Sequence, residues 1–229
     1  MLSVQDVHTY YADSYILQGV TLDVQPGQVV ALLGRNGVGK TTLARSIIGL
    51  TPARRGKILF KNTDITAMPA HRIARLGIGL VPQGRNIFQS LTVKEHLQVT
   101  ARGQGQWNFD RVVELFPNLL NRLRSLGSRL SGGEQQMLAA GRALVGNPEL
   151  LLMDEPTEGL APIVVRELGR TLESLKRAGT SILLIEQQLA FALRHADVVF
   201  IMSKGRIVHR CLPDELAADA ETKARYLGI

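Results

Sequence analysis

The sequence predicts an α/β fold built on a largely parallel β-sheet. Short, unbroken apolar runs recur along the chain, which is typical of strands covered on both faces. Helical periodicity separates several of these runs, and strands that alternate with helices favour a parallel sheet. With 229 residues, of which 45% are hydrophobic, the chain can bury a core without disulfides or a structural metal. The runs lie at residues 29–33, 78–81, 150–153, 182–185 and 198–202.

The first third of the chain contains two expected strands and a helix. Residues 20–24 (Val-Thr-Leu-Asp-Val) alternate apolar and polar as a half-buried strand does. Pro26 and Gly27 predict a turn after it. The run at 29–33 is then the first strand buried on both faces, and a helical pattern begins after Lys40.

Residues 84–147 interrupt the alternation of strands and helices. The apolar spacing over 112–123 predicts a helix, flanked by polar loops at 102–110 and 124–129. We therefore expect a helical subdomain at 84–147, inserted into one domain (1–229) whose core is formed by 1–83 and 148–229.

The last third continues the α/β pattern. The spacing over 164–175 predicts a helix, with Glu173 and Arg177 as a supporting pair one turn apart. Gly205 predicts a hairpin turn after the last apolar run. Residues 213–227 are expected to form a short closing helix.

Charge and composition exclude several classes of protein. The net charge is +7, and residues 1–110 hold 12 basic and 6 acidic residues, which suits an anionic ligand or partner. Aromatic residues make up only 5%, so no base-stacking surface is expected and no nucleic acid partner is predicted. Cys211 is the single cysteine, so no internal disulfide can form. No uncharged apolar run approaches the ~18 residues that span a bilayer, so any membrane role is expected to come through a partner.

A glycine-rich loop directly follows the run at 29–33. It fits the G-x-x-x-x-G-K-[ST] pattern in the strand–loop–helix context that this pattern requires. Glycines let backbone N–H groups surround phosphate oxygens. Lys40 can neutralise phosphate charge, and the Thr41 hydroxyl can ligate Mg²⁺. The loop therefore predicts a bound nucleotide, and it consists of Gly34, Arg35, Asn36, Gly37, Val38, Gly39, Lys40, Thr41 and Thr42.

Two carboxylates follow the run at 150–153. Asp154 and Glu155 are expected at the carboxyl end of a buried strand, which is where an α/β sheet binds ligands. Asp154 is predicted to hold Mg²⁺, directly or through water. Glu155 is predicted to polarise the water that attacks the phosphate.

A third motif lies about 20 residues before the acidic strand. Ser131 is a natural helix N-cap, and Gly132 and Gly133 expose backbone N–H groups ahead of a helical pattern. Together with the phosphate loop and the acidic pair, this motif makes the chain resemble the ATP-binding-cassette (ABC) ATPases. The resemblance covers essentially the whole chain. The resemblance implies a P-loop core with a mixed or parallel sheet, an N-terminal antiparallel β subdomain and an inserted helical subdomain, with ATP and Mg²⁺ as cofactors.

The resemblance also implies further roles. Gln83 would contact Mg²⁺ and join the core to the helical subdomain, and Gln187 would stand at the position of the switch residue. Tyr11 would stack on adenine, although Tyr10 and Tyr15 are close enough to be alternatives. The residues given catalytic roles are Lys40, Gln83, Glu155 and Gln187. Those that would contact ATP held by a second subunit, in a head-to-tail dimer, are Ser131, Gly132, Gly133 and Glu134.

Two positions depart from the common family pattern. Ala161 stands where an aspartate is usual, and Gln187 replaces the usual histidine. Glutamine can donate a hydrogen bond to a phosphate but cannot carry positive charge. We expect hydrolysis to persist, with a rate that is lower or more dependent on the partner.

The same region narrows the resemblance. Five segments carry this narrower resemblance: Glu155–Pro162, Val81–Arg85, Glu134–Met137, Glu186–Gln187 and the Tyr226–Gly228 ending. With them, the chain resembles ATPase subunits of branched-chain amino acid importers, and it is similar to their smaller, tail-less ATPase. Such a chain would pair with a second, identical or paralogous ATPase and two membrane permeases, would depend indirectly on an external solute-binding protein, and would lie at the cytoplasmic face of a prokaryotic membrane.

Three alternatives stay open. Urea and amide importers belong to the same group, and the solute cannot be read from this subunit. A soluble ABC ATPase that acts on DNA or ribosomes is a second alternative, although the 90 residues between Lys40 and Ser131 leave no room for a long coiled-coil insertion. The third is an ATP-binding switch that does not hydrolyse, which Ala161 and Gln187 alone favour.

Overall fold

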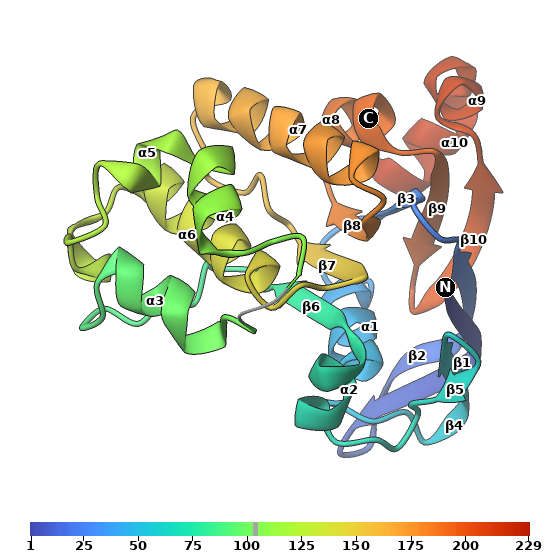
Figure 1. Ribbon diagram of the computed structural model, residues 1–229. Helices are drawn as coiled ribbons and strands as arrows, with labels where there is room; N and C mark the ends of the chain where they lie inside the picture. The colour runs from blue at the N-terminus through green and yellow to red at the C-terminus, as the bar shows by residue number, and fades with distance from the viewer. Residues whose placement is uncertain (103–104) are drawn as a thin grey trace.

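A six-stranded mixed sheet forms the centre of the molecule (Figure 1). The computed structural model describes residues 1–102 and 105–229. The strand order is β10-β9-β3-β8-β7-β6, and β10 alone pairs antiparallel. All five runs predicted to be strands are strands, three of them longer than predicted by a residue or two. The bounds are β3 Val29–Leu33, β6 Ile78–Val81, β7 Leu150–Asp154, β8 Ser181–Glu186, β9 Val198–Ser203 and β10 Arg206–Cys211.

Alternate residues of these strands enter two different cores, as the period-two geometry of a strand requires. Val30, Leu32 and Leu152 pack with α1 (Lys40–Ile47) and α2 (Ala70–Leu76) and with the N-terminal strands. Val29, Leu151 and Met153 pack on the opposite face with α7 (Pro162–Arg177) and the helices of the inserted region. A smaller cluster packs α8 (Leu189–His195) against β3 and β9.

The N-terminal strands form a separate antiparallel sheet of order β2-β1-β4-β5, which agrees with the expected β subdomain. The expected strand at 20–24 is the end of the longer β2. The bounds are β1 Leu2–Tyr11, β2 Ser14–Val24, β4 Arg55–Phe60 and β5 Thr63–Asp64.

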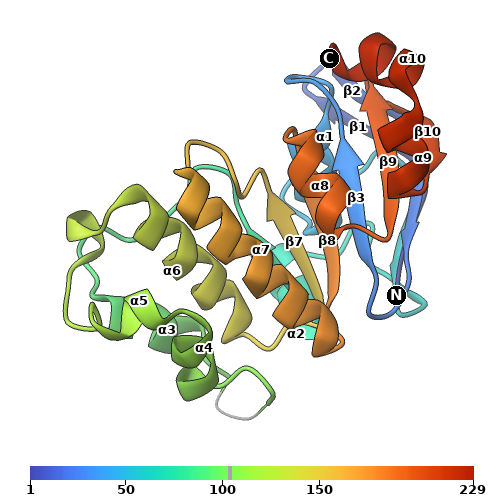
Figure 2. The ribbon, with the colours of Figure 1, turned by 90° about the horizontal axis from the view of Figure 1, so that it is seen from above.

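The chain between β6 and β7 is helical and projects to one side of the sheet (Figures 1 and 2). The single helix predicted over 112–123 is wrong, because Phe116 leaves the helical conformation (φ −123°, ψ 71°) and Pro117 starts another helix. The predicted loop at 102–110 ends early, since Asn108 caps a helix that begins at Phe109; Gly103 and Gln104 of that loop lie outside the described residues. The bounds are α3 Val93–Thr100, α4 Phe109–Leu115, α5 Pro117–Leu120, η1 Gly127–Arg129 and α6 Gly132–Leu144.

Two further predictions, both in the last third of the chain, are wrong. The single helix expected over 213–227 is broken at Asp219 (φ −88°, ψ 89°) into α9 (Pro213–Ala218), the short α10 (Ala220–Thr222) and a π-helical turn, η2 (Lys223–Leu227). Arg177 donates from Nε to the backbone oxygen of Glu173 at 3.3 Å and makes no ion pair with its carboxylate. The hairpin turn at Gly205 is confirmed. No helix in the described part of the chain is long and apolar enough to cross a membrane.

Candidate active site

The glycine-rich loop joins β3 to the N-terminus of α1 and borders a cavity of about 360 Å³. Gly39 adopts φ 110° immediately before α1, a conformation that L side chains rarely adopt. Because α1 starts at Lys40, the unpaired N–H groups of its first turn open toward this cavity, which suits phosphate oxygens. The cavity is lined by Ile16, Asn36, Gly37, Gly39, Lys40, Thr41, Thr42, Gln83 and Glu155.

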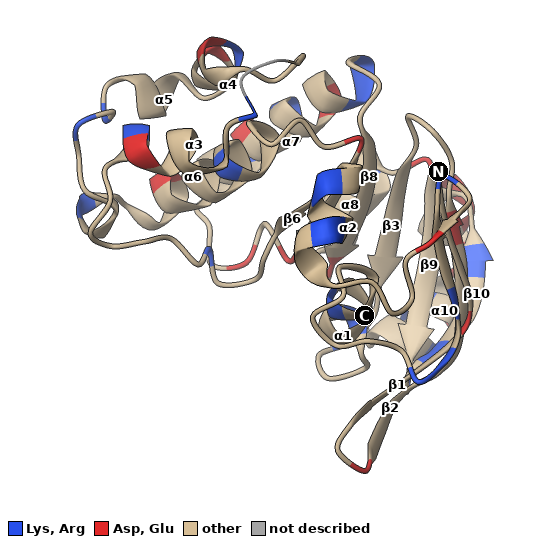
Figure 3. Ribbon diagram, turned by 60° about the horizontal axis from the view of Figure 1, so that its bottom comes forward, with Lys and Arg blue, Asp and Glu red and all other residues tan. Residues whose placement is uncertain are grey.

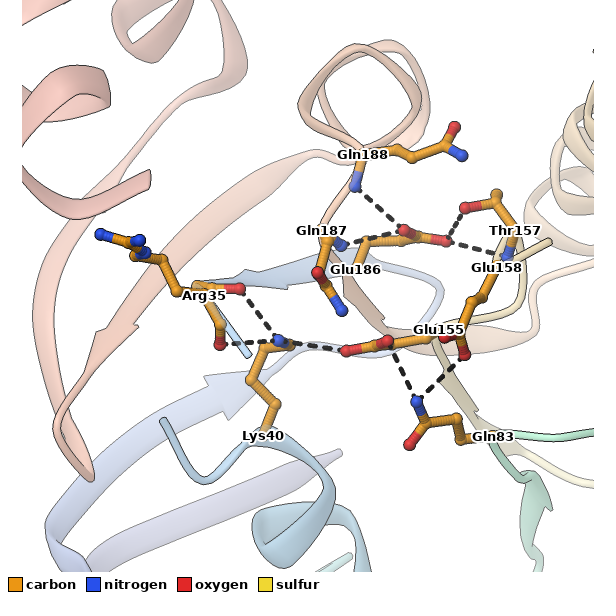
Figure 4. A network of polar contacts seen from close by, with 10 residues as sticks. Arg35, Lys40, Gln83, Glu155, Thr157, Glu158, Glu186, Gln187 and Gln188 are labelled. Carbon is orange, nitrogen blue, oxygen red and sulfur yellow. Dashed lines mark hydrogen bonds and ion pairs between the residues drawn. The ribbon is translucent and has the colours of Figure 1, made fainter. Parts of the chain in front are cut away.

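Lys40 is held by both the loop and the acidic strand end (Figure 4). Its Nζ donates to the backbone oxygens of Gly34 at 2.9 Å and Arg35 at 3.1 Å, and it lies 3.1 Å from Glu155 Oε1. Only 3% of the Lys40 side chain and 7% of the Glu155 side chain are exposed. The Lys40 ammonium and the Glu155 carboxylate are therefore in direct contact beside the phosphate loop.

Asp154 ends β7 and is 3% exposed. Burial raises the pKa of its carboxyl to about 6, although a hydrogen bond from the Thr41 hydroxyl opposes this shift. Its Oδ1 is buried and has no hydrogen-bond partner. An unsatisfied carboxylate oxygen beside a threonine hydroxyl fits a hard divalent cation, which prefers oxygen ligands and would supply the missing partner. Mg²⁺ binding by Asp154, Thr41 and Gln83 stays a prediction.

Two glutamines flank Glu155. Gln83 Nε2 donates to Glu155 Oε2 at 3.3 Å and to Glu158 Oε2 at 3.0 Å. Gln187 is exposed, and its side chain points toward the ion pair of Lys40 and Glu155 (Figure 4). Not all of the residues that were given catalytic or metal-binding roles line this cavity. Gln187 and Asp154 do not, and those that do are Lys40, Thr41, Gln83 and Glu155.

Glu186, to which the sequence analysis gave no role in the site, is 1% exposed and ends β8 next to this cavity. Its carboxylate accepts hydrogen bonds from Thr157 and from the backbone N–H groups of Gln187 and Gln188. Burial raises its pKa, and the hydrogen bonds from Thr157, Gln188 and Gln187 oppose that shift. An acidic residue at the end of an apolar run is the signal that could have revealed it, as it did for Asp154.

The Ser131 motif forms the N-terminus of α6 but lies apart from this cavity. Ser131 Oγ accepts from the Glu134 N–H at 3.3 Å, and Glu134 Oε2 accepts from the Ser131 N–H at 2.7 Å, which is a complete capping box. Glu134 Oε1 also lies 3.0 Å from Arg122 Nε. Residues 131–134 line a second cavity of about 790 Å³ together with Gly159 and Ala161, and none of these residues lines the first cavity.

Arg85 is a second residue to which the sequence analysis gave no role in the site. A methyl group on Gly132 would come within 3.1 Å of the guanidinium carbon of Arg85, so this cation packs against the first turn of α6. Arg85 reaches this position through a left-handed backbone conformation, with φ 68°.

Tyr11 lies at the tip of the β1–β2 hairpin and is 41% exposed. Tyr10 and Tyr15 stack on each other, with ring centroids 4.5 Å apart. Ile16, rather than any of the three tyrosines, lines the cavity at the phosphate loop. Adenine stacking by Tyr11 stays a prediction.

The single tryptophan and the single cysteine of the chain have surroundings that indicate structural roles. Trp107 is 6% exposed and its Nε1 donates to Thr180 Oγ1 at 3.4 Å. Burial raises the pKa of the Cys211 thiol, which disfavours a nucleophilic thiolate. Within the described residues, no group of three or more His, Cys, Asp or Glu side chains could hold a metal ion.

Comparisons with known proteins identify a family and several relatives of this chain. A family model described as "ABC transporter" matches residues 17–158. The chain is 40% identical to the high-affinity branched-chain amino acid transport ATP-binding protein BraG of Pseudomonas aeruginosa, over 100% of both chains. It is 34% identical to the lipopolysaccharide export system ATP-binding protein LptB of Escherichia coli K12, over 99% of this chain and 97% of LptB. Its structure resembles a nucleotide-free ATP-binding cassette from an ABC transporter, with a TM-score of 0.86, 26% identity and 96% of each chain covered.

Proposed function

Because this chain belongs to the ABC transporter family and is one of its ATPases, we propose that it energises the import of branched-chain amino acids. The chain is similar to BraG over its full length and more similar to BraG than to LptB, which supports an amino acid importer rather than a lipid exporter. ATPases of urea and amide importers are the second candidate, since Ala161, Gln187 and the residues around them fit that group as well.

The single structural observation that carries the proposed ATPase activity in a dimer is the division of the motifs between two cavities on one chain. Lys40, Glu155 and Gln83 line one cavity, and residues 131–134 line another. A nucleotide on the phosphate loop would therefore meet residues 131–134 only if a second subunit supplied them. This supports a head-to-tail dimer with two ATP molecules at its interface.

In the proposed reaction each side chain acts on one part of ATP. Lys40 binds the β- and γ-phosphates, and the N–H groups at the start of α1 bind their oxygens. Thr41 and Asp154 would hold Mg²⁺, and the chemistry that this ion would supply is neutralisation of the charge that develops on the phosphate. Glu155 accepts hydrogen-bond donation from the attacking water and orients it in line with the γ-phosphate. Gln187 donates to the γ-phosphate from its carboxamide.

The proposal also includes membrane permease subunits, to which this chain would bind at the cytoplasmic face of the membrane. A groove of about 300 Å³ lies between α2, β6, α3 and α6. Arg142 lies over the Phe88 ring at 5.2 Å, and Phe88, five residues after Gln83, is 52% exposed. α2 lines the groove with Ala74 and also carries Arg72 and Arg75; Figure 3 shows basic positions on this helix. An exposed aromatic and basic surface linked to Gln83 suits a partner whose docking must reach the nucleotide.

Hydrolysis by the purified chain tests the proposal. Specific activity with Mg-ATP should rise with protein concentration, and Glu155→Gln should abolish turnover while it accumulates an ATP-dependent dimer on a sizing column. A wild-type chain that binds ATP but neither hydrolyses nor dimerises at any concentration would contradict the homodimer. Co-expression with a second ATPase and the permeases would then test the heterodimer, and failure of the chain to copurify with permeases would contradict the transport role.

A further inference from the structure

Glu186 is a buried carboxylate that has no assigned role in the proposed reaction. It is 1% exposed and accepts four hydrogen bonds: from Thr157 Oγ1 at 2.7 Å, Thr157 N at 3.1 Å, Gln187 N at 3.0 Å and Gln188 N at 3.2 Å. Within the described residues it forms no ion pair with a basic side chain. A carboxylate buried without a cation is costly unless hydrogen-bond donors compensate it, and here the donors all come from two loops.

These two loops carry the residues that act on the γ-phosphate. Thr157 lies two residues after Glu155, and Gln187 directly follows Glu186. One oxygen of Glu186 holds Thr157, and the other holds the backbone of Gln187 and Gln188 (Figure 4). The carboxylate therefore links the loop of the catalytic glutamate to the loop of the switch residue.

Glu155 itself adopts a conformation that needs such support. Its φ is 48°, in the left-handed region that non-glycine residues rarely occupy. The residue is held on one side by its N–H, which donates to the Ile185 oxygen at 2.9 Å. On the other side, the turn is held by the bonds between Thr157 and Glu186. Strained conformations of this kind persist only where neighbouring contacts fix them.

From this geometry we propose that Glu186 is a positioning residue for ATP hydrolysis: it fixes the turn at Glu155 and the position of Gln187 relative to it. The inference rests on the proposed function. This role explains why a carboxylate is buried here, because a carboxylate accepts hydrogen bonds at both oxygens and can bind four donors at once. A glutamine of the same shape would turn an NH₂ group toward at least one of these N–H donors.

The first experiment compares Glu186→Gln with the wild type in Mg-ATP hydrolysis. The structure predicts that kcat falls about tenfold to a hundredfold, the range expected when reacting groups are displaced by a fraction of an ångström to one ångström. KM for ATP should change less than about twofold, because Lys40 and the phosphate loop are untouched. Glu149→Gln is the matched control. Glu149 lies directly before the amino end of β7, whereas Asp154 and Glu155 lie at its carboxyl end, and it pairs with Lys61 at 2.6 Å.

A second pair of variants keeps the test decisive if Glu186→Gln does not fold. Thr157→Ser keeps the hydroxyl that donates to Glu186 and should retain kcat, whereas Thr157→Val removes it and should lower kcat. A merely structural role predicts instead that kcat, KM and the melting temperature change together. In the background of Gln187→Ala, Glu186→Gln should cost less than it does alone, because the two act as a unit.

Hydrogen exchange separates this inference from the proposed function. The amides of Thr157, Gln187 and Gln188 should exchange faster in Glu186→Gln than in the wild type, whether or not the preparation hydrolyses ATP. A wild-type chain that shows no turnover, alone or with its partner subunits, would contradict the proposed function, and the exchange rates would then decide the inference alone. Wild-type kcat or unchanged exchange in Glu186→Gln would overturn it.

Discussion

The ion pair between Lys40 and Glu155 is almost wholly buried, and its removal should have a large, measurable effect without any nucleotide. Lys40→Met removes the ammonium that lies 3.1 Å from Glu155 Oε1 and leaves this carboxylate, 7% exposed, with Gln83 as its nearest donor at 3.3 Å. Breaking a buried pair costs about 3–5 kcal/mol. Because the pair borders a cavity that water can enter, we expect about 2–3 kcal/mol, which is at or below the lower end of that range.

The double variant Lys40→Met/Glu155→Gln should recover most of this loss, since it removes both charges. In a chain of 229 residues, the single substitution should lower the melting temperature by about 5–10 °C. The assay is urea unfolding of the nucleotide-free chain for the wild type, both single variants and the double variant. A coupling free energy of at least about 1 kcal/mol is expected, because the two groups are in contact. Additive effects of the two substitutions would refute the reasoning.

Three further predictions follow from the same contacts. Burial lowers the pKa of His96, whose Nε2 accepts from the Phe88 N–H, so the unfolded chain binds a proton more readily than the folded chain. The free energy of unfolding should therefore decrease as pH falls through 6.5, and in urea titrations at two pH values His96→Gln should show a smaller decrease; an equal decrease would contradict this. Asp154→Asn should weaken the Mg²⁺ dependence of ATP binding while nucleotide still binds without metal, and an unchanged Mg²⁺ titration would argue against Asp154 as a ligand. Gly205→Ala should destabilise the chain by about 1–3 kcal/mol in urea unfolding, because a methyl group there would lie 2.0 Å from the Ile16 oxygen at φ 76°; wild-type stability would contradict the turn geometry.

Features set by local sequence were predicted well. The buried strands were identified because their apolar runs are short, unbroken and bounded by glycine or polar residues. The N-cap at Ser131 and the hairpin at Gly205 were also identified, since each depends on the conformational preference of one or two residues.

The errors lie where local periodicity did not set the conformation. The apolar spacing over 112–123 continues through Pro117, but the helix does not, because proline cannot continue the hydrogen-bonding pattern of the helix before it. The closing segment was expected to be one helix, yet Asp219 leaves the helical conformation and its side chain caps Thr222. The i,i+4 pair of Glu173 and Arg177 did not form, since the Glu173 carboxylate faces His195 Nδ1 of α8 at 3.7 Å.

The sequence by itself determined the chemistry of this protein: a phosphate loop, an acidic strand end and a capped glycine motif, each built from residues close together in the chain. Only the tertiary structure decided how these parts meet. It placed Gln83, Lys40 and Glu155 in one cavity, placed residues 131–134 in another, and enclosed Glu186 between the loops of Thr157 and Gln187. The physical reason is that adjacent parallel strands align their carboxyl ends, so residues far apart in sequence share one edge of the sheet, and no local pattern records which of them touch.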